Sequence, residues 1–109
     1  MVKEPCVYIL ASGRHGTLYI GVTSNLMKRL HEHRNGHIQG FTHTHNVKRL
    51  VRFEWFEDML TAIGREKRLK NWRRDWKINL IESGNPHWTD LAVGLGLPPL
   101  APVKAPDGP

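Results

Sequence analysis

The chain has 109 residues, which is the size of one domain and excludes two. It carries 16 lysines and arginines against 10 acidic residues, so its net charge of +6 favours polyanionic partners. Hydrophobic residues make up 39% of the chain, which excludes a disordered protein, and the longest apolar run falls far short of the ~20 residues that a membrane helix needs.

The start of the chain and its cysteine content indicate a cytoplasmic protein. Glu4 and Pro5 interrupt the first residues, so no secretory signal is predicted. Cys6 is the lone cysteine, which excludes an internal disulfide, and its apolar neighbours predict a buried thiol.

The first half of the chain predicts a hairpin followed by a helix. Two runs rich in β-branched and aromatic residues, 6–10 and 18–22, flank a turn sequence at 12–16, which is typical of antiparallel strands. Because side chains alternate along a strand, Tyr8 and Tyr19 can lie close together on one face of this pair. Residues 23–25 offer helix caps, and a helix is expected over about 25–35. Arg29 and His33 are neighbours on its surface because they are four residues apart.

The second half predicts a strand and a long helical segment. Residues 50–56 read as the strand, and Asp58 is the expected cap of the segment. Its apolar stripe ends at 84–86, and about 25 residues is long for one globular helix, so we expect a break between 71 and 74. The spacing of Trp72 and Trp76 predicts that both pack into the core, and Trp88 is expected to anchor a segment that folds back.

The composition changes near Pro98. Five of the seven prolines lie in 98–109, together with small residues. We therefore place the domain at 3–92 and predict a flexible, proline-rich tail over 93–109.

A set of ordered polar residues carries a resemblance to a known family. The set consists of Tyr8, Tyr19-Ile20-Gly21, Arg29, His33 and Glu66. Over residues 4–92 the chain resembles the GIY-YIG nuclease superfamily, and it is most similar to the small stand-alone bacterial members, which are related to the catalytic domain of the excision-repair nuclease subunit. Cys6 and Val7 stand where this family has Gly and Ile, two positions that serve strand packing.

The resemblance implies an α+β fold, with a three-stranded antiparallel sheet flanked by helices, and a divalent-metal-dependent endonuclease that hydrolyses DNA phosphodiester bonds in repair or recombination. It implies that Glu66 binds Mg²⁺ or Mn²⁺, because one carboxylate plus phosphate and water is a common way to hold Mg²⁺. Arg29 would stabilise phosphoryl charge, while Tyr8, Tyr19 and His33 would position or deprotonate water. We also expect Arg29 and the metal to favour an ionised tyrosine.

Two assignments stay open at this stage. The superfamily places an asparagine after the glutamate, and Asn79 is our candidate for it. Taken alone, Glu66 also fits a surface glutamate paired with Lys70 at i+4.

Further basic residues and histidines are candidates for contacts with DNA. The predicted nucleic-acid-binding residues are Lys28, Arg29, Arg34, His43, His45, Lys67, Lys70, Arg73 and Arg74. The alternative to a phosphate-binding surface is a solvated helix face. The alternative to an enzyme is a non-catalytic nucleic-acid-binding module that retains the nuclease fold, and in either case a partner protein is one possible source of target choice.

Overall fold

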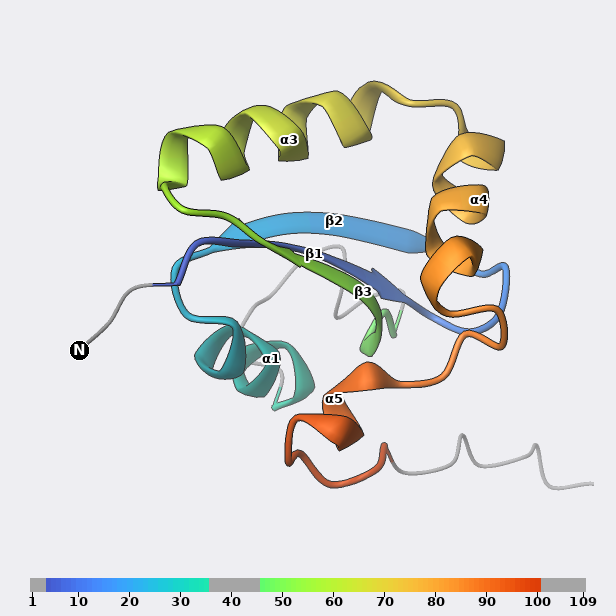
Figure 1. Cartoon of the computed structure of the whole chain (residues 1–109). Coiled ribbons are helices and arrows are strands. Elements are labelled where there is room, and N and C mark those ends of the chain that lie inside the picture. Colours follow the sequence, from blue (N-terminus) through green and yellow to red (C-terminus); the bar gives the residue numbers. More distant parts are fainter. Residues whose placement is uncertain (1–3, 36–45, 101–109) are drawn as a thin grey trace, which may run out of the picture.

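The computed structural model describes residues 4–35 and 46–100 (Figure 1). The predicted contacts of His43 and His45 lie outside the described residues, as does the end of the expected tail. The elements follow in the order β1 (Cys6–Ala11), β2 (Leu18–Thr23), α1 (Leu26–Arg34), β3 (Arg49–Trp55), α3 (Met59–Asn71), α4 (Arg74–Gly84) and α5 (Leu91–Gly94).

The three strands form one antiparallel sheet in the order β2-β1-β3, which confirms the predicted fold class. Strand β1 is central and buried along its whole length. Its register pairs Tyr8 with Gly21 on one side and with Phe53 on the other, and it pairs Leu10 with Tyr19. Tyr8 and Tyr19 therefore point to the same face of the sheet, as strand alternation predicts.

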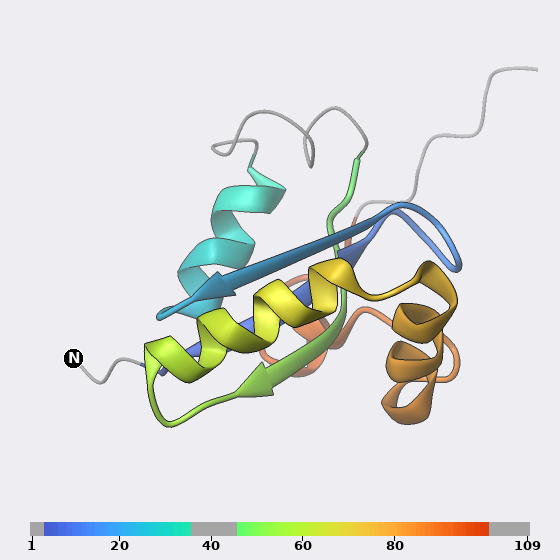
Figure 2. The ribbon, with the colours of Figure 1, turned by 90° about the horizontal axis from the view of Figure 1, so that it is seen from above.

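Helices cover both faces of the sheet (Figures 1 and 2). Tyr8 and Leu10 belong to a core cluster that includes Leu30 of α1 and Ala92 of α5. The alternate side chains of β1 belong to a second cluster, which packs against α3 and α4. Strand β1 is apolar because it lies between two cores, and its successive side chains pack into one core and the other in turn.

Side-chain caps start the two helices that carry the candidate site residues. Asn25 Oδ1 accepts a hydrogen bond from the backbone N–H of Lys28 at the start of α1. At the start of α3, Asp58 Oδ1 accepts one from the N–H of Thr61 at 2.7 Å. These caps satisfy backbone donors that have no partner within the helix, and both were expected from the residue types.

The long helical segment breaks between residues 71 and 74, as expected. Helix α3 ends at Asn71, Trp72 has an extended backbone, and α4 begins at Arg74. The break corrects the expectation for Trp76, which is 48% exposed rather than packed in the core. Trp72 and Trp76 do not share one helix, so their spacing of four residues does not place them on one buried stripe.

The chain after α4 folds back over the sheet. Trp88 is fully buried, as expected of an anchor. Asp90 accepts a hydrogen bond from the N–H of Leu50 in β3 and forms a 2.5 Å ion pair with Arg34 at the end of α1. Packing continues through Leu97, which is 5% exposed and lies five residues beyond the limit drawn at residue 92.

No helix within 4–35 or 46–100 is long and apolar enough to cross a membrane.

Candidate active site

Three aromatic side chains meet on the α1 face of the sheet. The ring centroids of Tyr8 and Tyr19 are 6.2 Å apart, and that of His33 lies 5.7 Å from Tyr8 and 5.4 Å from Tyr19. Tyr8 Oη lies 3.0 Å from His33 Nε2, a hydrogen bond whose donor depends on the tautomer of His33. The structure therefore brings together three residues, of which the first and last, Tyr8 and His33, are 25 positions apart in the sequence.

Gly21 makes room for the Tyr8 ring. A Cβ atom added at Gly21 would lie 2.4 Å from both Cζ and Oη of Tyr8. A ring held by the core cannot withdraw from such an overlap, so a side chain at this position would displace the phenol. A glycine thus suits the last position of the Tyr-Ile-Gly sequence, because this position faces Tyr8 across the β1–β2 pair.

Burial keeps both Tyr8 and His33 neutral. Burial raises the pKa of Tyr8, and the neighbouring Tyr19 adds to this effect. Arg29 acts on Tyr8 in the expected direction and favours its ionised form, but burial outweighs it, so the phenol is protonated at neutral pH. Burial and then the charge of Arg29 lower the pKa of His33 to about 4. At neutral pH His33 is therefore an uncharged imidazole, able to accept a proton.

Arg29 supplies a positive charge at the edge of this cluster. Its side chain is 40% exposed, and its Nε lies 4.0 Å from a carboxylate oxygen of Glu32, three residues on in α1. Such an exposed, long ion pair contributes little to stability. The guanidinium thus remains accessible to a second anion while its field acts on both Tyr8 and His33.

Glu66 lies on the sheet-facing side of α3. It is four residues after Ala62 and three before Leu69, both fully buried, and its own side chain is only 14% exposed. The neighbouring Arg65 donates hydrogen bonds to both carboxylate oxygens of Glu54 in β3, which fixes the rotation of the helix. Glu66 is therefore not a fully solvated surface residue, although its i+4 pair with Lys70 exists, with Nζ and Oε1 3.1 Å apart.

Lys70 pairs with Glu66 and also lines a cavity beside Tyr19. A cavity of about 210 Å³ is lined by Tyr19, by its neighbours in β2, and by Lys70 and Lys77. Lys77 Nζ also donates a hydrogen bond to the carbonyl oxygen of Lys70 across the α3–α4 break. Two ammonium groups thus stand beside Tyr19 at the outer edge of β2, which suits a phosphate. Lys77 belongs to the basic face of the long helical segment, and the fold shows that it lies beside Tyr19.

The donor set at this site fits a metal ion that is held mainly by substrate. Within the described residues, no group of three or more His, Cys, Asp or Glu side chains could hold a metal. Glu66 is a single, partly buried carboxylate whose present partner is an amine that a divalent cation can displace. A lone carboxylate completed by phosphate oxygens and water is an ordinary way to hold Mg²⁺.

The other basic residues predicted to bind nucleic acid divide into two groups. Lys28, Lys67 and Arg73 are exposed, with the guanidinium of Arg73 stacked over Trp76. Arg34 is not available in the same way, because its side chain is 10% exposed and pairs with Asp90. Arg74 is exposed but donates hydrogen bonds to two carbonyl oxygens of the β1–β2 turn.

Asn79 is exposed on α4, and its side chain forms no hydrogen bond with a described residue. Asn85, which lies beyond the helix, is instead buried and bonded to Val51 and Thr89, so it serves the fold.

The chain thus combines a small antiparallel sheet and flanking helices with two tyrosines and a histidine on one face of the sheet. A glutamate lies on α3, the helix that packs against the edge strand β2. Residues 4–79 match the GIY-YIG catalytic domain, and the chain belongs to this nuclease family. The family match covers the three strands, α1, α3 and half of α4.

Small proteins of the UPF0213 group are similar to this chain. A UPF0213 protein of Clostridium perfringens is 40% identical over 77 residues, which cover 71% of this chain and 82% of the relative. One from Syntrophus aciditrophicus is 36% identical, covering 73% and 91%, and one from Staphylococcus saprophyticus is 32% identical, covering 72% and 94%. No solved structure matches the chain at a significant level.

Proposed function

We propose that this protein is a divalent-metal-dependent endonuclease that hydrolyses phosphodiester bonds in DNA, with DNA repair or recombination as its setting. Membership of the GIY-YIG family supports the nuclease class. The observation that carries the proposal is the contact between Tyr8 and His33 beside Tyr19, with Arg29 at the edge of the cluster.

The buried pair of Tyr8 and His33 forms a proton relay in this proposal. Neutral His33 accepts the phenol proton of Tyr8 at Nε2, while Tyr8 Oη takes a proton from the attacking water. The relay takes one proton from water and leaves His33 as an imidazolium. Its positive charge balances the negative charge of the hydroxide that attacks the phosphorus. A protonated Tyr8 suits this role because a relay group must both give and receive a proton.

The remaining residues hold the substrate. Arg29, which is 40% exposed, binds the phosphoryl oxygens, and its planar guanidinium matches their geometry. Tyr19 lines the cavity that contains Lys70 and Lys77, and we assign one adjacent phosphate of the DNA backbone to each of these two ammonium groups. Lys28, Lys67 and Arg73 extend the positively charged surface along the bound DNA strand.

Glu66 would hold the divalent cation, Mg²⁺ or Mn²⁺. When bound, this ion polarises the phosphoryl oxygen and stabilises the charge that develops on the leaving oxygen. Glu66 offers a carboxylate that is 14% exposed and positioned by α3, and its Oε1 lies 3.1 Å from Lys70 Nζ.

Cleavage assays on DNA of several structures test this function. Purified protein is incubated with single-stranded, duplex, flapped and branched DNA in the presence of Mg²⁺, Mn²⁺ or EDTA. We expect metal-dependent cleavage that Glu66→Gln reduces by at least about 100-fold while DNA binding is retained. Glu57→Gln is the matched control, because Glu57 is an exposed glutamate in the turn before α3.

Two outcomes would overturn the proposal. DNA binding without cleavage of any substrate by the wild-type protein would assign it to the non-catalytic binding modules. Cleavage that Glu66→Gln and EDTA leave unchanged would come from a contaminant or from another site.

A further inference from the structure

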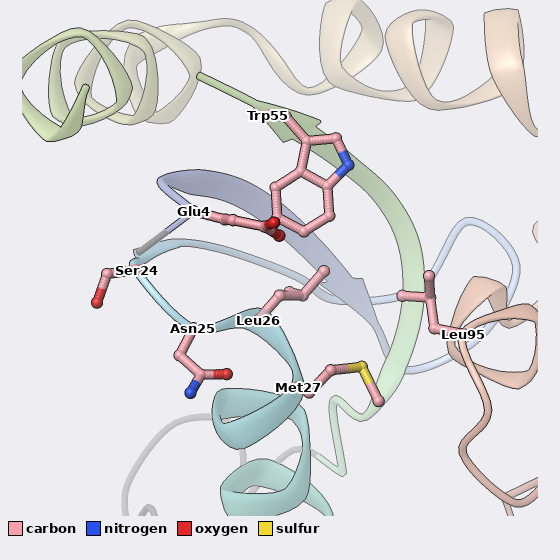
Figure 3. Close-up of a pocket in the computed structure, with 7 residues that line it drawn as sticks. All are labelled: Glu4, Ser24, Asn25, Leu26, Met27, Trp55 and Leu95. Atoms are coloured by element: carbon pink, nitrogen blue, oxygen red, sulfur yellow. The ribbon is translucent and has the colours of Figure 1, made fainter. Parts of the chain in front are cut away.

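Trp55 stands between two cavities at the end of the molecule where β1 begins. One cavity, of about 320 Å³, is lined by Trp55 and Glu4 together with Leu26 and Met27 at the start of α1 (Figure 3). The other, of about 310 Å³, is lined by Trp55 and Glu4 together with Glu57. The side chain of Trp55 therefore borders two hollows, and the residue is 50% exposed.

Trp55 differs from the other tryptophans in its surroundings. The guanidinium of Arg65 lies 5.2 Å from the ring of Trp72, and that of Arg73 lies 4.8 Å from the ring of Trp76. Trp88 is buried and contacts the ring of His15. Among the described residues, Phe53 is the one ring neighbour of Trp55, and none places a cation over its indole.

The charges around Trp55 are opposite in sign to those of the chain as a whole. Glu4 and Glu57 are exposed and form no ion pair with a described residue, and none of the described residues lining either cavity is basic. An indole face bordered by carboxylates attracts a guanidinium or an ammonium group, because both the ring quadrupole and the carboxylates favour positive charge. The same surface repels a DNA phosphate.

We propose that the Trp55 site, formed by Trp55, Glu4, Glu57, Leu26 and Met27, binds an arginine or lysine side chain that a partner protein presents within a short apolar segment. The cationic head lies over Trp55 between the two carboxylates, and the apolar neighbours of the cation contact Leu26 and Met27. Each cavity matches a large side chain in size, which favours a peptide over a larger cofactor. The site shares no residue with the group formed by Tyr8, Tyr19, His33 and Arg29, so a partner can bind while DNA is held.

Titration of the full-length ¹⁵N-labelled protein with a small peptide tests this site by NMR. The probe is acetyl-Leu-Arg-Leu-amide, and the readouts are the indole N–H of Trp55 and the amide of Leu26. We expect saturable shifts at both positions, and about fivefold weaker binding when citrulline replaces the arginine. The double variant Glu4→Gln/Glu57→Gln loses a similar factor. Trp76→Phe is the matched control, since Trp76 is equally exposed but already carries Arg73, and it binds the probe as the wild type does.

Three results would overturn the proposal. Equal affinity for the citrulline and arginine peptides would show that the site is an apolar groove that does not recognise positive charge. Shifts of Trp55 that follow protein concentration without peptide would assign the surface to a second copy of the chain. The lack of saturable binding up to about 10 mM peptide would leave no useful affinity for a cation.

Discussion

Tyr8 and His33 share a 3.0 Å hydrogen bond although both side chains are almost completely buried, each being 2% exposed. This bond joins the central strand to α1 within the core cluster on that face. A buried polar pair of this kind is stable only when each partner satisfies the other, so the phenol and the imidazole depend on one another for position.

Replacement of Tyr8 by Phe removes the hydroxyl and keeps the ring. We expect the rate of DNA cleavage to fall about 100-fold, because His33 loses the group that passes it a proton. The free energy of unfolding should fall by only about 1–2 kcal/mol, the cost of leaving a buried imidazole nitrogen unbonded. Single-turnover cleavage and urea unfolding measure the two effects. Cleavage by the variant at the wild-type rate would remove Tyr8 from the mechanism.

The lowered pKa of His33 predicts how stability depends on pH. In the unfolded chain His33 takes up a proton near pH 6.5, whereas in the folded protein it does so only near pH 4. The unfolded state therefore binds more protons in this window, and the free energy of unfolding falls as the pH drops from 6.5 to 4, by roughly 3 kcal/mol in all.

Urea unfolding across pH 4–7 checks this dependence, with His33→Gln as the comparison. The carboxylates with lowered pKa values, Glu54 among them, titrate in both proteins and cancel in the difference. The slope of stability against pH should be smaller in the variant by about 1.4 kcal/mol per pH unit. Parallel curves for the two proteins would show that His33 is not held neutral by the fold.

A side chain at Gly21 should harm both stability and activity. Gly21→Ala places a methyl group against the Tyr8 ring, and we expect a loss of about 1–3 kcal/mol together with reduced cleavage. Gly64→Ala is the control within α3, where the added Cβ would meet only the end of the Arg68 side chain at 3.7 Å. This second change should stabilise the helix by about 0.5–1 kcal/mol. Thermal unfolding of both variants measures these changes in stability. Equal losses of stability in the two variants would contradict the prediction.

Lys70 and Lys77 should each account for one phosphate contact. The double variant Lys70→Gln/Lys77→Gln is expected to bind DNA more weakly and to reduce the slope of log affinity against log salt by about 2. Lys48→Gln is the control, because Lys48 is a half-buried lysine outside the cavity beside Tyr19. Fluorescence anisotropy between 50 and 200 mM salt measures the slopes. A slope unchanged by the double variant would place the DNA backbone elsewhere.

Local patterns in the sequence predicted the elements and the pairing of the two tyrosines. Strand alternation placed Tyr8 and Tyr19 on one face, and residue types at the helix starts identified Asn25 and Asp58 as caps. These features depend on neighbours a few positions away, so the sequence contains the information directly.

Partners distant in the sequence could not be predicted in this way. Arg34 looked like a free cation for DNA, but the fold brings Asp90 to it across 56 positions. The burial of Leu97 amid prolines was also missed, because composition reports the average tendency of a segment and not a single apolar residue that finds a cavity. Trp76 was misplaced because a helix break changes the face of every later residue.

The segment that follows α4 determines how far the chain can be shortened. The family match ends at residue 79, yet Ile81, Trp88, Ala92 and Leu97 are buried against both faces of the sheet. A chain trimmed to the matched residues would leave β3 uncovered on the Asp90 side and would free the end of α1, the helix that carries Arg29 and His33. The residues outside the family signature thus help to hold α1, with Arg29 and His33, against the sheet.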